Sequence, residues 1–168
     1  MRALTVVVVV ALAVAGCESR EARLSEDCGD GGTAACRELV PLLQRTCDGG
    51  VAGDCDKLGW IYHNGLGVPQ DRTRAATMWE KACDGGDAGG CSNLGVMYRK
   101  GMGVTQDATR ALSLYQQACD GGHAAGCSNL GVMYQKGMGV TQDDGMASIY
   151  IRKACDLGLA EVCDAIVR

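Results

Sequence analysis

Residues 94–119 read LGVMYRKGMGVTQDATRALSLYQQAC, in which a glycine-rich loop separates two stretches with helical spacing of apolar residues. In the first stretch, Cys91, Leu94, Gly95 and Tyr98 stand at i, i+3, i+4 and i+7, the spacing of one helix face. The sequence KGMGV that follows supplies the permissive backbone at which helices end. We therefore expect the first helix to end at this loop.

A second helix is predicted after the loop. It begins at Asp107, a residue type favoured at helix N-caps, and Ala108, Ala111, Tyr115 and Ala118 form its expected buried row. The glycines of the sequence CDGG end it. The unit is thus predicted to be two antiparallel helices joined by GMGVTQD.

This unit recurs with a period of 36 residues. Residues 83–107 and 119–143 differ at only three of 25 positions, and the same plan recurs from Leu58 onward. A fixed period of this length is typical of a solenoid, in which units must stack because one helix pair buries too little apolar surface. Small residues are expected to let the paired helices pack closely. They are Gly59, Gly95 and Gly131 on the first helices, and Ala75, Ala111 and Ala147 on the second.

Ten of the eleven cysteines form pairs separated by eight residues. Each pair spans the turn between one unit and the next, a separation that can bring the two thiols within bonding reach. We expect disulfides rather than zinc, because zinc ligands usually lie two to four residues apart in sets of four. The predicted pairs are Cys28/Cys36, Cys47/Cys55, Cys83/Cys91, Cys119/Cys127 and Cys155/Cys163.

The N-terminus is predicted to be a secretory signal. Its apolar run, residues 3–16, reaches about 21 Å as a helix, which is too short for a membrane span. VAGC at 14–17 resembles a bacterial lipobox and predicts that Cys17 is lipid-modified, whereas AVA at 13–15 fits ordinary signal-peptidase cleavage. Without Cys17 an even ten cysteines remain to pair. We expect a lipid-anchored envelope protein, with Glu18 favouring the outer membrane; a periplasmic or secreted form is the alternative.

The predicted domain organisation follows from these features. The expected segments are a signal peptide (1–16), a linker (17–27) and a solenoid (28–168), the last divided into a truncated cap (28–47), repeats at about 48–83, 84–119 and 120–155, and a half-repeat cap (156–168). Pro41 lies in the truncated cap and is expected to open a short second helix, because proline disrupts a continuous one.

The skeleton of LGVMYRKGMGVTQDATRALSLYQQAC closely resembles the Sel-one-like repeat, a relative of the tetratricopeptide repeat. With a cysteine pair in each unit, residues 28–168 resemble the Helicobacter-type cysteine-rich subfamily of secreted proteins. The resemblance implies a right-handed α-solenoid that binds proteins or peptides. It also implies an alternative, because members of this subfamily are described as penicillin-binding or as weak β-lactamases.

The residues offer little for the hydrolase alternative. No Ser-x-x-Lys, Ser-Asp-Asn or Lys-Thr-Gly motif is present, and the two histidines, His63 and His123, form no His-Glu-x-x-His motif. We therefore assign no catalytic residue, metal site or cofactor. The net charge of -4 gives no basic footprint for nucleic acid.

Two rows of polar residues on the first helices are the predicted binding surface. Stacked units would align each row into a groove that grips carbonyls or carboxylates of an extended protein or peptide in the envelope. The alternative interpretation is a solvated face. The first row is Lys57, Asn93 and Asn129, and the second row is Asn64, Lys100 and Lys136.

Overall fold

The computed structural model describes residues 22–163. The predicted signal peptide, Cys17 and the start of the linker lie outside the described residues, as does the end of the C-terminal cap. All regular structure within 22–163 is helical, and it begins with a short helix over 22–29. The helices that follow are α2 (Thr33–Asp48), α3 (Ala52–Asn64), α4 (Arg72–Asp84), α5 (Ala88–Lys100), α6 (Ala108–Asp120), α7 (Ala124–Lys136), α8 (Asp144–Asp156) and α9 (Ala160–Cys163).

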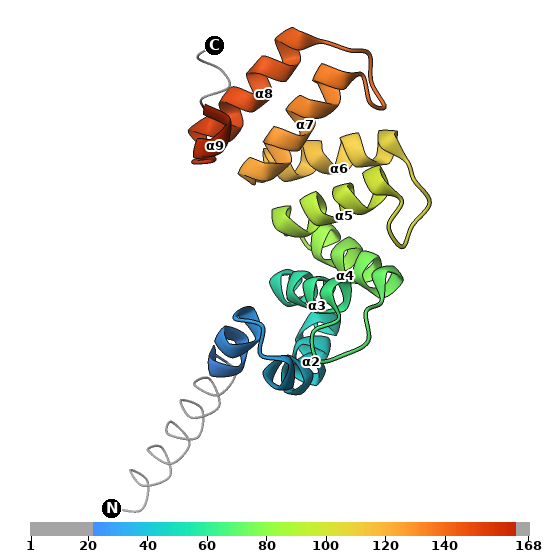
Figure 1. Ribbon diagram of the computed structural model, residues 1–168, viewed down its shortest axis with the longest axis vertical. Coiled ribbons are helices and arrows are strands. Elements are labelled where there is room, and N and C mark those ends of the chain that lie inside the picture. Colours follow the sequence, from blue (N-terminus) through green and yellow to red (C-terminus); the bar gives the residue numbers. More distant parts are fainter. Residues whose placement is uncertain (1–21, 164–168) are drawn as a thin grey trace, which may run out of the picture.

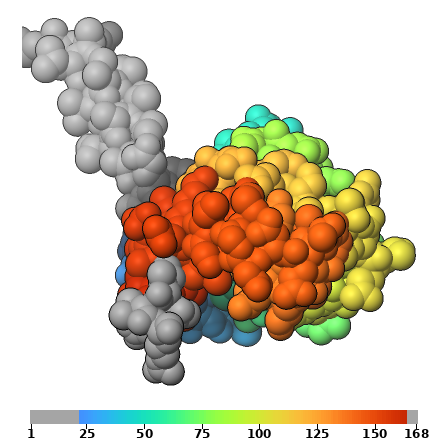
Figure 2. Space-filling model, turned by 90° about the horizontal axis from the view of Figure 1, so that it is seen from above, coloured from blue at the N-terminus to red at the C-terminus, as the bar shows by residue number. Residues whose placement is uncertain are grey.

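The helices form an α-solenoid, as predicted. Helices α3 and α4, α5 and α6, and α7 and α8 are the antiparallel pairs, and successive pairs follow one another along an arc (Figure 1). Seen from above, the last pair covers much of the earlier ones, so the units are stacked along one direction (Figure 2). No helix within 22–163 is long and apolar enough to span a membrane.

The second helix of each pair begins at an aspartate N-cap, as predicted for Asp107. Its carboxylate accepts a hydrogen bond from the backbone N–H of Arg110 at 2.9 Å. Asp71 and Asp143 cap α4 and α8 in the same way. The repeated Gln-Asp sequence therefore fixes where each second helix starts.

Small residues allow the two helices of a pair to pack closely. A Cβ atom on Gly95 would lie 2.7 Å from the ring of Tyr115, and one on Gly59 would lie 2.6 Å from the ring of Trp79. The facing alanine of the second helix, Ala111, is completely buried. This confirms the predicted close approach and explains how a chain without phenylalanine fills its core.

The second glycine of each loop rests on the preceding unit. Gly103 has a left-handed backbone (φ 72°), and a Cβ there would lie 2.5 Å from the main-chain carbonyl of Arg72, the first residue of α4. Gly139 makes the same approach to Ala108. The loops are therefore contacts between units as well as connections within them.

Replacement of Gly103 by alanine tests this contact. We expect Gly103→Ala to lower the free energy of unfolding by about 1–3 kcal/mol more than Gly86→Ala does, because the added methyl group overpacks the interface. Gly86 is a matched control, since it also has positive φ (87°) but its Cβ would meet nothing within 4 Å. Chemical denaturation of both variants measures the difference, and equal losses would show that the loop contact is unimportant.

Disulfides join successive units at the positions predicted. The paired Cα atoms lie 4.5–5.2 Å apart, the ordinary range for a disulfide. Each closes a short loop, which stabilises the fold by about 2–3 kcal/mol in the chain-entropy model. The bridges are Cys28–Cys36, Cys47–Cys55, Cys83–Cys91, Cys119–Cys127 and Cys155–Cys163.

The prediction that Pro41 starts a separate short helix is wrong. Helix α2 runs without interruption through Pro41, whose ring is exposed. Its buried residues Cys36, Leu39, Leu43 and Cys47 form one continuous face. A proline inside a helix costs about 3 kcal/mol, whereas burial of each leucine contributes roughly 1.5–3 kcal/mol. Disulfides near both ends hold the helix further, so packing outweighs the local preference.

The two ends of the array use partial units. Helix α2 replaces the second helix of a full unit, because Gly67 in the following loop rests on its first residues and its final cysteine bonds to α3. At the other end, α9 begins a further first helix and is bonded to α8 through Cys155–Cys163.

Candidate functional site

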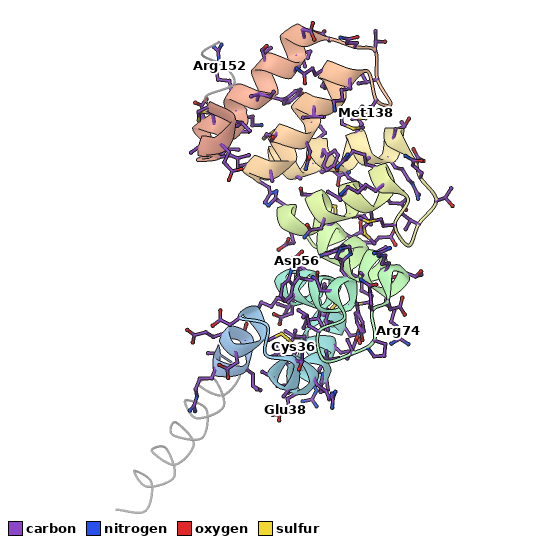
Figure 3. The ribbon with its side chains drawn as sticks, in the orientation of Figure 1. Cys36, Glu38, Asp56, Arg74, Met138 and Arg152 are labelled. Atoms are coloured by element: carbon purple, nitrogen blue, oxygen red, sulfur yellow. A yellow bond between two sulfur atoms is a disulfide. The ribbon has the colours of Figure 1, made fainter. Side chains whose placement is uncertain are left out.

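The first helices of successive units, α3, α5 and α7, lie next to one another and present a shared inner surface. The two predicted rows run across these helices. In Figure 3, Asp56 of α3 is labelled on the side toward which the arc curves, near the start of α5. This inner surface is the candidate site.

The first row makes contacts within the protein. The amide of Asn93, which is half-buried, donates a hydrogen bond to Asp56 Oδ1 at 3.0 Å. The ammonium group of Lys57 lies 2.9 Å from Asp54 Oδ1. Asn129 is half-buried at the equivalent position of α7. Two members of this row therefore already have carboxylate partners.

The second row is more open. Asn64 donates to the carbonyl of Trp60 in its own helix at 2.8 Å. Lys100 and Lys136 are exposed, at equivalent positions one repeat apart, and neither forms an ion pair or hydrogen bond with a described residue. These two ammonium groups are the part of the predicted surface that remains available to a partner.

The inner surface also carries a half-buried carboxylate, that of Asp56, which the sequence analysis missed. Burial raises the pKa of Asp56, and the charge of nearby Asp87 raises it further. Asn93, Trp79 and, when protonated, His123 act in the opposite direction. Asp87 and His123 are the N-caps of α5 and α7, and their side chains accept hydrogen bonds from backbone N–H groups. Asp56 thus lies at the junction between its own unit and the next, to which Asn93 belongs.

Alignment of the repeats carries a signal for Asp56. The equivalent residues of α5 and α7 are Ser92 and Ser128, so Asp56 is a carboxylate where the other two full repeats have serine. The sequence analysis assigned no role to His123. In the structure its Nδ1 accepts a hydrogen bond from the backbone N–H of Gly126 at 3.3 Å and caps α7.

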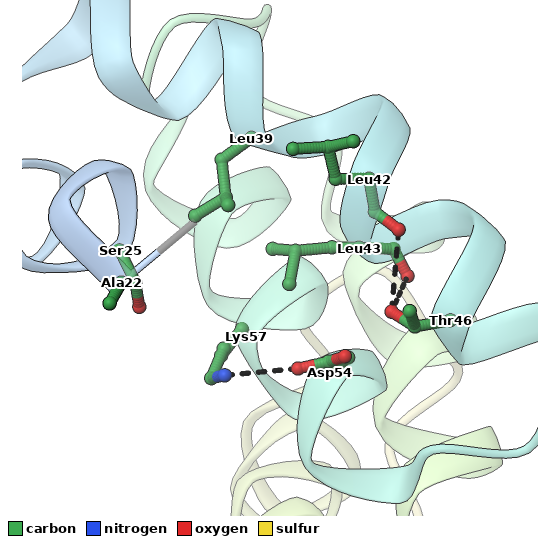
Figure 4. A pocket seen from close by; sticks show the side chains of 8 residues that line it. All are labelled: Ala22, Ser25, Leu39, Leu42, Leu43, Thr46, Asp54 and Lys57. Carbon is green, nitrogen blue, oxygen red and sulfur yellow. Dashed lines mark hydrogen bonds and ion pairs between the residues drawn. The ribbon is translucent and has the colours of Figure 1, made fainter. Parts of the chain in front are cut away.

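Two clefts lie between the helix over 22–29, α2 and α3. The first, which we call the Asp54 cleft, has a volume of about 290 Å³ (Figure 4). The second, the Asp56 cleft, has a volume of about 230 Å³. The two share Ser25, Leu39 and Lys57, so they adjoin.

The arrangement of these clefts does not favour the hydrolase alternative. Ser25 and Lys57 line both clefts, but the lysine ammonium is bound to Asp54, and no described hydrogen bond links it to the serine.

The histidine His63 lies outside these clefts. Burial together with the charges of Arg72 and Lys100 lowers the pKa of His63, which packs against Trp79. Within 22–163 no three His, Cys, Asp or Glu side chains are grouped so as to hold a metal ion.

A model of the Sel1 repeat family matches residues 55–87, 88–123 and 124–159, which is more than half of the chain. The chain belongs to the Sel1 repeat family. Proteins of this family have repeats that serve protein–protein interaction. A comparison with curated proteins found no match.

Solved Sel1 repeat structures confirm the fold. A Sel1 repeat protein from Oxalobacter formigenes is 25% identical with a TM-score of 0.73, and the match covers 77% of this chain and 54% of the Oxalobacter chain. A protective antigen of uropathogenic Escherichia coli is 29% identical with a TM-score of 0.72, and the match covers 87% of this chain and 35% of the antigen. This chain therefore spans only about half and a third of their lengths. Helicobacter pylori cysteine-rich protein B is 24% identical with a TM-score of 0.65, and the match covers 79% of this chain and 96% of the Helicobacter protein.

Ionisation of Asp56 is expected to destabilise this Sel1 repeat array at neutral pH. Because the folded-state pKa is above the unfolded value near 3.8, the folded protein takes up the proton first as pH falls. We expect Asp56→Asn, which preserves the acceptor for Asn93, to raise the free energy of unfolding at pH 7 by up to about 1 kcal/mol. The gain should shrink as the pH falls toward 4.

Asp54→Asn is the matched control with the opposite sign. Burial acts to raise the pKa of Asp54, but the nearby hydroxyl of Thr46 and the ammonium group of Lys57, which donates to Asp54 at 2.9 Å, outweigh it and lower the pKa. Its contribution to stability is therefore present above the unfolded pKa and lost as pH falls, so Asp54→Asn should destabilise at pH 7. Denaturant titrations at pH 7 and 4 compare the two variants, and destabilisation of both at pH 7 would contradict the assignment for Asp56.

Proposed function

We propose that the protein is a scaffold of the bacterial cell envelope that binds an extended segment of another protein along the inner surface of α3, α5 and α7. The observation that carries this proposal is the repeated, exposed pair Lys100 and Lys136, which have no partner among the described residues. Two cations at the same height on stacked helices can bind carboxylates or carbonyls of one chain at successive points.

Several features support an extracytoplasmic location. Ten cysteines paired as disulfides indicate an oxidising compartment. The likeness of this chain to Helicobacter pylori cysteine-rich protein B also supports a location outside the cytoplasm. Attachment of the protein to a membrane through a lipid on Cys17 remains a prediction from the VAGC sequence.

Site-specific photo-crosslinking tests the binding surface. A photoreactive amino acid at position 100 or 136 of the full-length protein, expressed in its own envelope, should form the same crosslinked species from both positions. Placed at Thr109, an exposed residue of the second helix α6, it should form none. Lys100→Ala combined with a photoreactive group at position 136 should reduce the yield severalfold. Equal yields from all three positions, or none, would contradict the proposal.

Cys17→Ser tests the anchor. We expect wild-type protein to incorporate radiolabelled palmitate and to fractionate with membranes, because the acyl chains partition into the bilayer. The variant should lose the label and leave the membrane fraction. Labelling that persists in the variant, or an unlabelled wild-type protein, would show that Cys17 is not the lipidation site.

A further inference from the structure

An acidic group and an exposed aromatic ring both line the Asp56 cleft. Asp56 and Trp60 are four residues apart on α3 and therefore share a helix face, and both line the cleft. Trp60 is 40% exposed, a high value for tryptophan. Leu39 and Ile61, both buried, supply apolar walls from α2 and α3.

The carboxylate in this cleft is held in place but has no bound cation. Asn93 fixes Oδ1 of Asp56 at 3.0 Å. The indole N–H of Trp79, a side chain only 4% exposed, has no hydrogen-bond partner of ordinary geometry, although it lies close enough to lower the pKa of Asp56. Lys57 lines the cleft, but its ammonium group binds Asp54 instead. A half-buried negative charge is thus positioned without a positive partner.

We propose that the Asp56 cleft binds an arginine or lysine side chain from the partner segment, with the cationic head at Asp56 and the aliphatic stem against Trp60. This inference rests on the proposed scaffold function and specifies one residue class that the scaffold recognises. The aliphatic stem of such a side chain is buried against the exposed indole of Trp60, and its cationic head forms a charge-assisted hydrogen bond with Asp56. Together they select an organic cation with an apolar stem.

A peptide suits this site better than a free small cation does. The adjoining Asp54 cleft adds Leu42 and Leu43 to the shared Leu39, so an apolar residue next to the cationic one has its own place (Figure 4). A metal ion is disfavoured, because hard cations take six or more oxygen ligands and no group of three candidate ligands exists within 22–163.

Binding of a defined probe tests the site. The probe is an acetylated and amidated Leu-Arg-Leu tripeptide, and its control replaces arginine by citrulline, which has the same shape without the charge. The protein has two tryptophans, so its indole N–H signals in ¹⁵N NMR spectra report on Trp60 in the cleft and Trp79 beneath it. We expect the arginine peptide to shift the Trp60 signal in a saturable way, and the citrulline peptide to bind at least about fivefold more weakly.

Three variants define the contribution of each group. Asp56→Asn should weaken binding of the arginine peptide about fivefold or more, and Trp60→Ala, followed through backbone signals, should weaken it severalfold. Lys57→Ala should strengthen binding, because it removes a positive charge that lines the cleft and repels the incoming cation. Asp84→Asn removes a carboxylate from a separate cleft, which residues of α4, α5 and α6 line, and should leave binding of the arginine peptide unchanged.

The proposal would be overturned by equal binding of the arginine and citrulline peptides, by no effect of Asp56→Asn, or by weaker binding to Lys57→Ala. Its failure is distinct from failure of the scaffold function. If crosslinks form at positions 100 and 136 while the arginine peptide does not bind, the partner is recognised elsewhere on the inner surface. If neither occurs, the scaffold function itself fails.

Discussion

Each junction between units depends on a short turn that a disulfide closes. The turn fixes the end of one second helix against the start of the next first helix, with paired Cα atoms 4.5–5.2 Å apart. This covalent constraint matters because the core is built from alanine, leucine, methionine and cysteine rather than from phenylalanine. A narrow core of this kind supplies limited burial energy, and small scaffolds commonly compensate with disulfides.

The same constraint positions the inner surface. The bridges Cys83–Cys91 and Cys119–Cys127 lie at the starts of α5 and α7, close to the N-cap residues Asp87 and His123. The glycines of the helix contacts recur as Gly59, Gly95 and Gly131, whereas Asp56 is replaced by Ser92 and Ser128, and the N-cap Asp87 is replaced by His123. The array therefore repeats these structural contacts and varies some of the groups that a partner would meet. A single distinct site on a repeated scaffold is consistent with recognition of one segment in one register.

The sequence predicted what depends on local pattern. Helix boundaries, the close approach at Gly95 and the cysteine pairs all follow from spacing within one repeat. Pro41 was misjudged because its local preference is outweighed by burial of Leu39 and Leu43 on the far side of the helix. Asp56 was missed because its environment comes from Asn93, in the next unit. The clefts could not be predicted either, since one wall is the helix over 22–29, which lies outside the repeat.

Disulfide mapping tests the central claim, that neighbouring units are joined by local bridges. An aspartate lies inside every predicted eight-residue loop, at positions 30, 48, 84, 120 and 156. Cleavage before aspartate, combined with trypsin, therefore separates the two cysteines of each pair unless a disulfide holds them. Mass spectrometry under non-reducing conditions should find five linked peptide pairs, each joining cysteines eight residues apart. Links between distant cysteines, or free thiols at these positions, would contradict the account.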